Sequence, residues 1–322
     1  MTRIAVGAIV MTALSCQPCG AAEPSYPAKP IRMLVGFGPG GAADVLARIL
    51  GQKLTNAWGQ IVVVDNRPGA TTTIAAETVA NAKPDGYTLL VISSAHAVSA
   101  GLYTKLSYDP VKSFSPITLI ASAPLVLAAT PSLAARSVGE LIAAAKTAPG
   151  KITYGSSGTG SITFLAGELL KSQAEIDIVH VPYKNMSQLQ GDLMAGNIQL
   201  AFTSIPAGLG LVKSGRIKAL GVTSAMRSAS LPEVRTISES GVTGYEVSNW
   251  YGVLAPAGLR QAIMKTVHAQ IVSSVQTPEG VEAITRQGAD PKVSTPDEFQ
   301  AYLATEVAKW TQVVKSAGIR PE

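Results

Sequence analysis

Short apolar segments alternate with longer segments of helical periodicity along most of the chain. In the first third, the apolar segments 31–35, 61–64 and 89–92 predict strands. The segments 42–54 and 73–82 carry apolar residues at helical spacing and predict helices between these strands. This alternation is typical of an α/β fold with short parallel strands, in which a ligand binds at the carboxyl ends of the strands.

The same alternation continues through the middle of the chain, and the last quarter is mostly helical. The further predicted strands are 125–129, 152–154, 178–181, 198–202 and 219–222, and the further predicted helices are 138–147, 161–172, 260–276, 280–287 and 296–316. The chain has 322 residues, of which 47% are hydrophobic. Because a domain usually takes about 100–200 residues, we expect two domains.

The charge distribution of the chain argues against nucleic-acid binding. The chain has a formal net charge of +5, and its Lys and Arg residues are scattered rather than gathered into a block interleaved with aromatic residues. Nucleic-acid binding usually needs such a basic surface. We therefore expect no nucleic-acid partner.

Residues 1–22 have the pattern of a cleaved secretory signal peptide. Arg3 gives a charged start, residues 4–15 form a short apolar run, and residues 20–22 are small. The run is too short to span a bilayer, which takes about 20 residues. We therefore expect export to the periplasm. Leu14-Ser15-Cys16 loosely resembles a lipobox, so a lipoprotein is the alternative.

Thiol chemistry and a histidine metal site are not expected in the mature chain. Cys16 and Cys19 have CxxC spacing, but both lie in the segment that cleavage would remove. The three histidines, His96, His180 and His268, show no metal-type spacing. We therefore expect no disulfide, no metal and no cofactor.

A glycine-rich turn, Gly38-Pro39-Gly40-Gly41, joins the first predicted strand to the first predicted helix. Such a turn at a helix start lets the backbone approach an anion closely. Gly38, Gly40 and Ala43 also fit a dinucleotide fingerprint, with Asp65 where a ribose-binding acid would sit. Dinucleotide binding is thus one interpretation, and a turn in which Asp65 caps backbone amides is the other. No Gly-Lys-Ser/Thr follows, so a triphosphate site is not expected.

A second turn of this kind, Gly-Ser-Ser-Gly-Thr-Gly at 155–160, precedes the helix predicted at 161–172. It lacks the Gly-x-Ser-x-Gly of a hydrolase because Thr159 takes the place of the last glycine, although a Ser/His/acid triad built from distant residues stays open. Neither turn carries Lys or Arg, a combination that suits a carboxylate better than a polyphosphate. Two ordinary tight turns are the alternative. Two such turns in an exported two-domain protein favour facing sites across a cleft.

Several distinctive motifs follow one another in order, namely 38–41 (GPGG), 63–69 (VVDNRPG), 84–90 (PDGYTLL), 108–110 (YDP), 180–184 (HVPYK) and 250–258 (WYGVLAPAG). On these motifs the chain resembles the Bug family, the extracytoplasmic solute receptors of tripartite tricarboxylate transport systems. The resemblance implies a two-lobed α/β periplasmic binding protein of the type II-like class, with the ligand in the interlobe cleft. It also implies discontinuous lobes, 27–124 with 224–322 and 125–223.

The resemblance further implies a ligand site built from both turns and from nearby strand ends. The expected site consists of Phe37, Gly38, Gly40, Gly41 and Asp44 from the first turn, Ser156, Ser157, Gly158, Thr159, Gly160 and Ser161 from the second, and Ser93, Ser94, His96 and Thr203. Phe37 would pack on the ligand, and the amides of Gly40, Gly41 and residues 156–161 would hold its oxygens. Asp44 would fix the first turn. Ser94 and Thr203 would read the far end, and for His96 the alternative is a histidine that bonds only to backbone.

Three residues depart from the family pattern. Gly38 stands where the family commonly has Pro, Phe164 where many members have His, and Thr203 where many have Asp. Because an Asp could pair with a ligand ammonium, Thr203 predicts a ligand without an amino group. The expected ligand is a dicarboxylate, or an aromatic or uncharged-tail carboxylate.

The resemblance implies a non-catalytic, monomeric receptor that delivers its ligand to the permease subunits of a tripartite tricarboxylate transporter. Two alternatives remain from the sequence. One is an exported nucleotide-dependent enzyme or hydrolase, and the other is a ligand sensor that docks onto a signalling partner.

Overall fold

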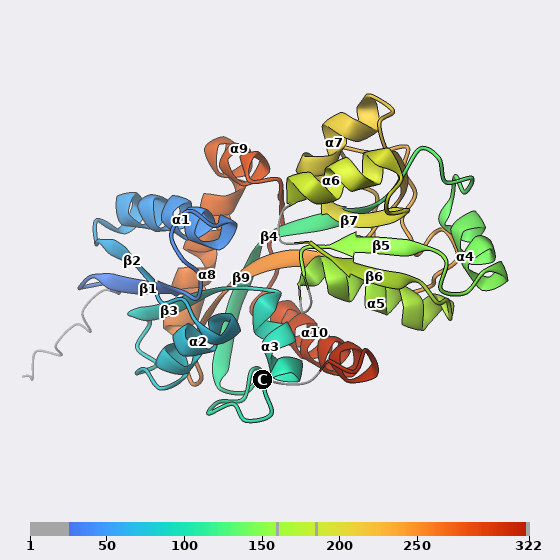
Figure 1. Cartoon of the computed structure of the whole chain (residues 1–322). Coiled ribbons are helices and arrows are strands. Elements are labelled where there is room, and N and C mark those ends of the chain that lie inside the picture. Colours follow the sequence, from blue (N-terminus) through green and yellow to red (C-terminus); the bar gives the residue numbers. More distant parts are fainter. Residues whose placement is uncertain (1–25, 159–160, 184–185, 320–322) are drawn as a thin grey trace, which may run out of the picture.

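The computed structural model describes residues 26–158, 161–183 and 186–319. Figure 1 shows two groups of helices and strands joined by long strands that run through the middle of the molecule. The strands follow the order β2-β1-β3-β9-β4-β7-β5-β6, and β8 and β10 also pair with β4. The predicted α/β architecture is therefore present, with one sheet that continues through both groups.

The first group of strands is built around β1. Strand β1 (Ile31–Val35) lies between β2 (Val62–Asn66) and β3 (Thr88–Ser93), and all three run parallel. Strand β9 (Ser248–Pro256) then runs antiparallel to β3 and to β4 (Phe114–Ala129). The sheet is thus mixed: the three strands of the first third run parallel, as the sequence indicates, and β9 and β4 add antiparallel pairs.

Strand β4 passes from one group to the other and changes partners on the way. Its residues up to Pro124 pair with β9, and those from Leu125 pair with β7 (Leu200–Ser204) and β8 (Lys218–Val222). Beyond β7, the parallel strands β5 (Thr153–Ser156) and β6 (Val179–Pro182) complete the sheet. We call the part before this change of partners, with β9, the first lobe, and the part after it the second lobe.

Helices cover both faces of the sheet in each lobe (Figure 1). In the first lobe, α1 (Ala42–Trp58), α8 (Gln261–Gln276) and α9 (Pro278–Arg286) lie on one face, and the turn η1 (Ala70–Thr72), α2 (Thr73–Ala80), α3 (Ala95–Leu102) and α10 (Pro296–Ser316) lie on the other. The helices of the second lobe are α4 (Val138–Thr147), α5 (Ile162–Ala174), α6 (Met186–Ala195) and α7 (Ile205–Lys213), and β10 (Asp290–Pro291) pairs with β4.

Local signals set the ends of several helices. Helix α10 begins at a capping box, in which Glu298 N donates to Thr295 Oγ1 over 3.2 Å and Thr295 N donates to the Glu298 carboxylate over 2.8 Å. Helix α1 ends at Gly59, whose φ of 66° suits a residue without Cβ. The start of α10 coincides with its predicted start at residue 296, whereas α1 continues to Trp58, beyond its predicted end at residue 54.

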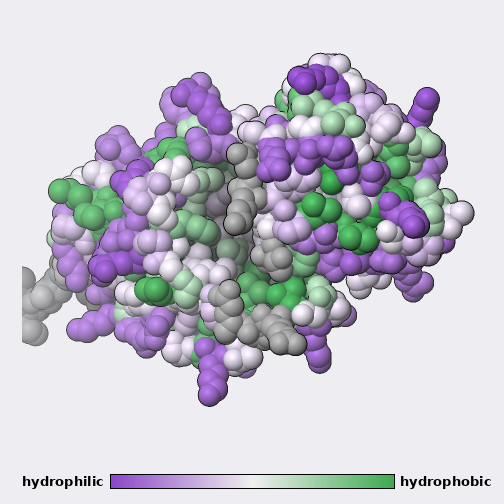
Figure 2. Space-filling view, in the orientation of Figure 1, coloured by the Kyte–Doolittle hydropathy of each residue, from purple (hydrophilic) through white to green (hydrophobic). Residues whose placement is uncertain are grey.

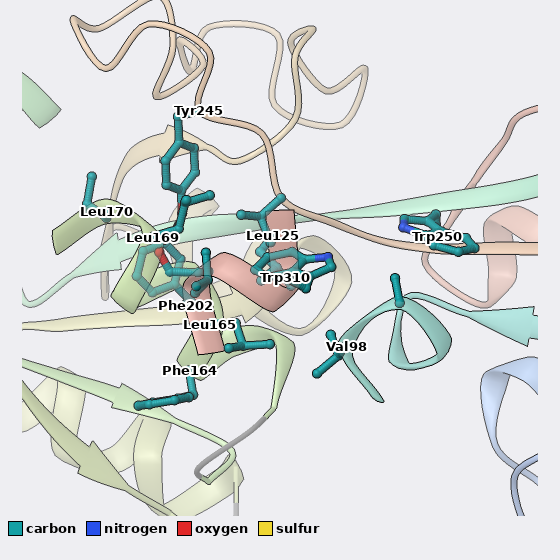
Figure 3. Close-up of a cluster of buried hydrophobic side chains, with 14 of the residues drawn as sticks. Val98, Leu125, Phe164, Leu165, Leu169, Leu170, Phe202, Tyr245, Trp250 and Trp310 are labelled. Carbon is teal, nitrogen blue, oxygen red and sulfur yellow. Dashed lines mark hydrogen bonds between the residues drawn. The ribbon is translucent and has the colours of Figure 1, made fainter. Parts of the chain in front are cut away.

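One hydrophobic core extends through both lobes (Figure 3). Trp310 of α10 lies in it together with Val98 of α3, Leu125 of β4 and Leu165 of α5. The buried carboxylate of Glu306 accepts hydrogen bonds from the indole N–H groups of Trp250 and Trp310, over 2.8 and 2.9 Å. Helix α10 therefore connects the lobes on the face that carries α3 and α5.

The segment between β8 and β9 contacts the second lobe. Ile237 N donates to Val222 O over 2.9 Å, and Tyr245 Oη donates to Ala166 O over 2.8 Å. These bonds indicate that the chain returns to the first lobe near residues 247–248 rather than near residues 223–224. We therefore propose lobes of 27–124 with 248–322, and 125–247.

Across the residues that the structure describes, no helix is both long enough and apolar enough to cross a membrane. Residues 1–22, for which the sequence predicts a signal peptide, lie outside the described residues.

Candidate functional site

A cavity of about 190 Å³ lies between the two lobes. Its walls are Phe37, Thr71, Ser93, Ser94, Ala95, Val98 and Asn249 from the first lobe, and Ser161 and Ile162 from the second. Figure 2 shows that the surface is hollowed between the two halves of the molecule. None of the described residues that form the walls has an ionisable side chain, while several carry hydroxyl or amide groups.

The N-terminal ends of two helices open onto this cavity. Ser94 and Ala95 are the cap and first residue of α3, and Ser161 and Ile162 are the cap and first residue of α5. A helix carries a partial positive charge at its N-terminus, where the first N–H groups have no acceptor inside the helix. Two lobes therefore direct two positive helix ends at one cavity.

A buried carboxylate organises the loop between β1 and α1, which we call the first loop (residues 36–41). Asp44 accepts hydrogen bonds from Gly40 N (2.9 Å), Asn66 Nδ2 (2.8 Å) and Arg48 Nε (3.0 Å), and Asn66 Nδ2 also donates to Phe37 O. Burial by itself would raise the pKa of Asp44, but these hydrogen bonds outweigh it and hold the pKa below its usual value. The carboxylate is thus ionised and holds the loop.

The glycine amides of the first loop do not all face a ligand, in contrast to the prediction. The N–H of Gly40 donates to Asp44, so it is not available to hold a ligand oxygen. Gly40 has a φ of 86°, a conformation that glycine adopts without strain. Gly38 and Gly41 belong to the same loop, and neither is among the residues that form the cavity wall.

Hydroxyl groups organise the loop between β5 and α5, which we call the second loop (residues 157–161). Gly158 N donates to Ser156 Oγ over 3.1 Å, and Ser157 N donates to Thr163 Oγ1 over 3.0 Å. Ser161 Oγ donates to Gly158 O over 2.6 Å. The amides of Ser157 and Gly158 are thus used within the loop, in contrast to the expected role of residues 156–161. Thr159 and Gly160 lie outside the described residues.

Ser156 and His180 form a pair behind the second loop. Ser156 Oγ lies 2.7 Å from His180 Nε2, and the imidazole packs against the rings of Tyr154 and Phe164. Burial lowers the pKa of His180 below its ordinary value. Ser156 is 0% exposed, and its hydroxyl bonds to His180 and accepts from Gly158 N. The pair therefore positions the loop and gives no support to the hydrolase alternative.

Asp65, the residue on which a dinucleotide site would depend, forms ion pairs with two arginine side chains. Arg32 Nε donates to its carboxylate over 2.7 Å, and Arg67 Nε approaches it to 3.2 Å. The hydrogen bonds from Arg32 hold the pKa of Asp65 below its usual value. Asp65 therefore acts in an ion pair, and neither the ribose contact nor the backbone cap describes it.

Two further expected site residues, His96 and Thr203, lie away from the cavity wall. His96 is 0% exposed, its Nε2 lies 2.9 Å from Pro110 O, and its ring packs against Tyr108 and Phe114. Burial lowers the pKa of His96 to about 4. This agrees with the alternative of a histidine bonded to backbone. Thr203 of β7 is also buried, and no described residue is a hydrogen-bond partner of its hydroxyl.

Thr71 and Asn249 also lie in the cavity wall, and neither was predicted from the sequence. Ser94 Oγ donates to Asn249 Oδ1 over 2.7 Å, and Asn249 Nδ2 donates to Tyr251 Oη over 2.8 Å. Asn249 is a polar residue near the start of the largely apolar strand β9, which is the one local signal that could have indicated it. Thr71 has no comparable signal, because its place at the cavity depends on the turn η1.

Comparison with known proteins identifies the class. A solved structure titled "R. palustris Rpa4515 with adipate" is 35% identical and gives a TM-score of 0.71, covering 92% of this chain and 100% of that one. The structure of the periplasmic binding protein BugD is 30% identical with a TM-score of 0.67 and the same coverage. The fold is that of a periplasmic binding protein, as predicted.

The family follows from the sequence comparisons. The model of the "Tripartite tricarboxylate transporter family receptor" matches residues 46–319. Protein BugT of Bordetella pertussis is 35% identical over 324 aligned positions, which cover 99% of each chain. The chain belongs to this receptor family, whose members bind solutes and are not enzymes. The predicted Bug resemblance is confirmed.

Proposed function

We propose that this receptor captures a small organic carboxylate in the interlobe cavity and delivers it to the membrane subunits of a tripartite tricarboxylate transporter. The observation that carries the proposal is that the N-terminal ends of α3 and α5 open onto one cavity from two lobes. A carboxylate between them would be favoured by both helix ends. A relative with 35% identity has been solved with adipate, a dicarboxylate.

The walls of the cavity support a small ligand with an apolar stretch. The volume of about 190 Å³ is below the roughly 300–1,000 Å³ of pockets for drug-sized ligands. Phe37, Val98 and Ile162 offer apolar surface to the carbon atoms of such a ligand. Because burial of a charge is favourable only with compensating polar groups, the hydroxyl groups in the wall would hold the oxygens.

A ligand without an amino group fits this wall better than an amino acid. An ammonium group would need an anionic partner, and no described residue of the wall carries a carboxylate. The preference for a dicarboxylate or an uncharged-tail acid therefore no longer depends on Thr203. Since Thr203 is buried in β7, Thr203→Asp would bury an unpaired charge, and lost binding in that variant would not separate specificity from stability.

A negative charge placed at the start of α5 tests the proposal directly. Ser161→Asp keeps a good helix cap, because Asp and Ser cap helices about equally well. Two carboxylates that meet near a protein surface repel by about 4 kcal/mol at 4 Å, so adipate binding in calorimetry is expected to weaken at least about a hundredfold. Ser137→Asp, at the cap of α4, is the matched control and should bind adipate like the wild type. Equal affinity in Ser161→Asp and wild type would contradict the proposal.

We also propose that residues 1–22 are removed on export and that the mature receptor is a periplasmic monomer. The known relative BugD is a periplasmic binding protein, which supports this location. Intact-mass measurement of the protein from a periplasmic extract tests the removal of residues 1–22. A mass that retains residues 1–22, or a lipid-modified Cys16, would contradict cleavage by an ordinary signal peptidase.

A further inference from the structure

The turn η1 lines the interlobe cavity in an unusual conformation. Ala70, Thr71 and Thr72 are consecutive non-glycine residues with φ of 43°, 49° and 75°. Two of them are β-branched, and such residues rarely adopt the left-handed region because Cβ crowds the backbone. Elsewhere in the described part of the chain, only Glu175 at the end of α5 shares a positive φ without being glycine. Strained backbone of this kind persists where the surrounding structure holds it and is concentrated at functional sites.

Close packing against Gly36, the first residue of the first loop, holds this turn in place. A Cβ built on Gly36 would lie 2.5 Å from Thr72 Cβ, so Gly36 leaves the space that Thr72 needs. Thr72 N donates to Gly69 O over 3.0 Å and closes the turn. The Thr72 hydroxyl is buried without a partner among the described residues, which adds to the cost of this conformation. Because Gly36 precedes Phe37, the turn is locked against the start of the first loop.

Thr71 is the residue of this turn that reaches the cavity. Its Oγ1 lies 3.2 Å from the Oη of Tyr103. Each hydroxyl has one hydrogen to donate, and a bond between the two groups uses only one of them. When Tyr103 donates to Thr71, the Thr71 hydroxyl keeps its own hydrogen for an acceptor in the cavity. The strained turn thus presents a donor at a position that neither helix end occupies.

We propose that Thr71 is a specificity-determining ligand contact, whose hydroxyl donates a hydrogen bond to an oxygen at the far end of the bound solute. With one carboxylate held between α3 and α5, this donor favours a dicarboxylate over a monocarboxylate of the same length. The inference rests on the proposed function, because it concerns the same cavity. Under this proposal, the turn η1, which has no recognisable sequence motif, selects ligands that carry a second carboxylate.

Thr71→Val tests this assignment with adipate and hexanoate, two acids with six carbon atoms. Valine keeps the β-branch and the volume of threonine and removes only the hydroxyl. A hydrogen bond to a charged group corresponds to about a tenfold to hundredfold change in affinity, which is the expected loss for adipate in calorimetry. Hexanoate affinity is expected to stay within about threefold, because hexanoate lacks the second carboxylate. Thr71→Ser, which keeps the hydroxyl, should retain the wild-type preference for adipate.

Thr78→Val is the matched control, because its exposed hydroxyl bonds only to Ile74 O within α2, away from the cavity wall. This variant should bind both acids like the wild type. An unchanged ratio of adipate to hexanoate affinity in Thr71→Val would overturn the inference, and so would an equal loss for both acids. If the wild type binds adipate and Thr71→Val binds it equally well, only this inference fails. If the wild type binds neither acid, the inference and the proposed function fail together.

Discussion

The first and second loops face one cavity but are held by different chemistry. In the first loop, the single buried carboxylate of Asp44 collects donors from Gly40, Arg48 and Asn66. In the second loop, neutral hydroxyl groups bond to one another and to the backbone, and no described residue of that loop is charged. One loop therefore depends on one charge, and the other on a network of weak contacts.

The two halves of the binding site therefore have different roles. A carboxylate with several donors concentrates its stabilisation at one residue, so the first loop has a defined shape before a ligand arrives. A hydroxyl can rotate its hydrogen from one acceptor to another at little cost. The second loop can therefore exchange an internal hydrogen bond for a bond to a ligand oxygen without a change of backbone.

The largest effect is expected from Asp44→Ala. It leaves the N–H of Gly40 and the amide of Asn66 without their acceptor in a buried place. The loss of a buried charged partner destabilises proteins by about 3–5 kcal/mol, and we expect about 3 kcal/mol because the Arg48 side chain is half exposed and keeps its hydration. Urea unfolding measures the stability, and calorimetry with adipate measures the accompanying loss of binding.

Asp44→Asn is the control for this variant. The amide oxygen can still accept from Gly40 N, so we expect a smaller loss of stability than in Asp44→Ala. A loss below about 1 kcal/mol in Asp44→Ala would show that the first loop does not depend on one charge, since that is the size of an ordinary hydrogen bond.

A smaller effect is expected from Ser161→Ala in the second loop. It removes the cap of α5 and the bond to Gly158 O, and the loss of a helix cap corresponds to about 1 kcal/mol. The bond from Ser157 N to Thr163 stays in place and should keep the loop folded. Urea unfolding should show the same loss for Ser137→Ala, the cap of α4, whereas only Ser161→Ala should weaken adipate binding.

The smallest effect distinguishes the two loops by pH. His180 has a lowered pKa in the folded state, so its contribution is complete above about 6.5, its value in the unfolded chain, and declines as the pH falls below that. Asp44 also has a lowered pKa, so its contribution is complete above about 4 and is lost only at lower pH. Between about pH 6.5 and about pH 4, the stabilisation from His180 behind the second loop should decrease, whereas the stabilisation from Asp44 in the first loop should stay constant.

Comparison of wild type with His180→Gln by urea unfolding at pH 7 and pH 5 measures this effect. The stability difference between the two proteins should change over this range, whereas that between wild type and Asp44→Asn should stay constant. His96, with a pKa of about 4, lowers the stability of every variant over the same range, so only differences between variants isolate His180. A constant difference for His180→Gln would contradict the prediction.

Much of the fold could be predicted because its signals are local. The predicted segments 31–35, 138–147 and 296–316 coincide with β1, α4 and α10. The first half of β4 was missed, since it contains Pro116 and changes register twice against β9. Helix α7 was also missed, because Gly208 and Gly210 are poor helix formers in its interior, although Pro206 lies in its first turn, where proline is tolerated.

The candidate site was predictable only in part. Phe37, Ser94 and Ser161, which belong to strand-to-helix turns, do lie in the cavity wall. His96 and Thr203 are near such turns in sequence but lie in buried positions away from it. Thr203 lies in strand β7, where successive side chains point to opposite faces, and His96 lies in helix α3, where only one side of the helix can face the cavity.

The sequence by itself determined the family, the glycine-rich turns at the helix starts, and the absence of Lys and Arg from those turns. These features depend on residue type and short spacing, which folding does not change. Only the tertiary structure decided which amides are already used, where Asp65 and His96 find their partners, and that Thr71 and Asn249 share a cavity with Ser161. Those outcomes depend on residues far apart in the chain, whose contacts arise from the packing of two lobes around β4 and β9.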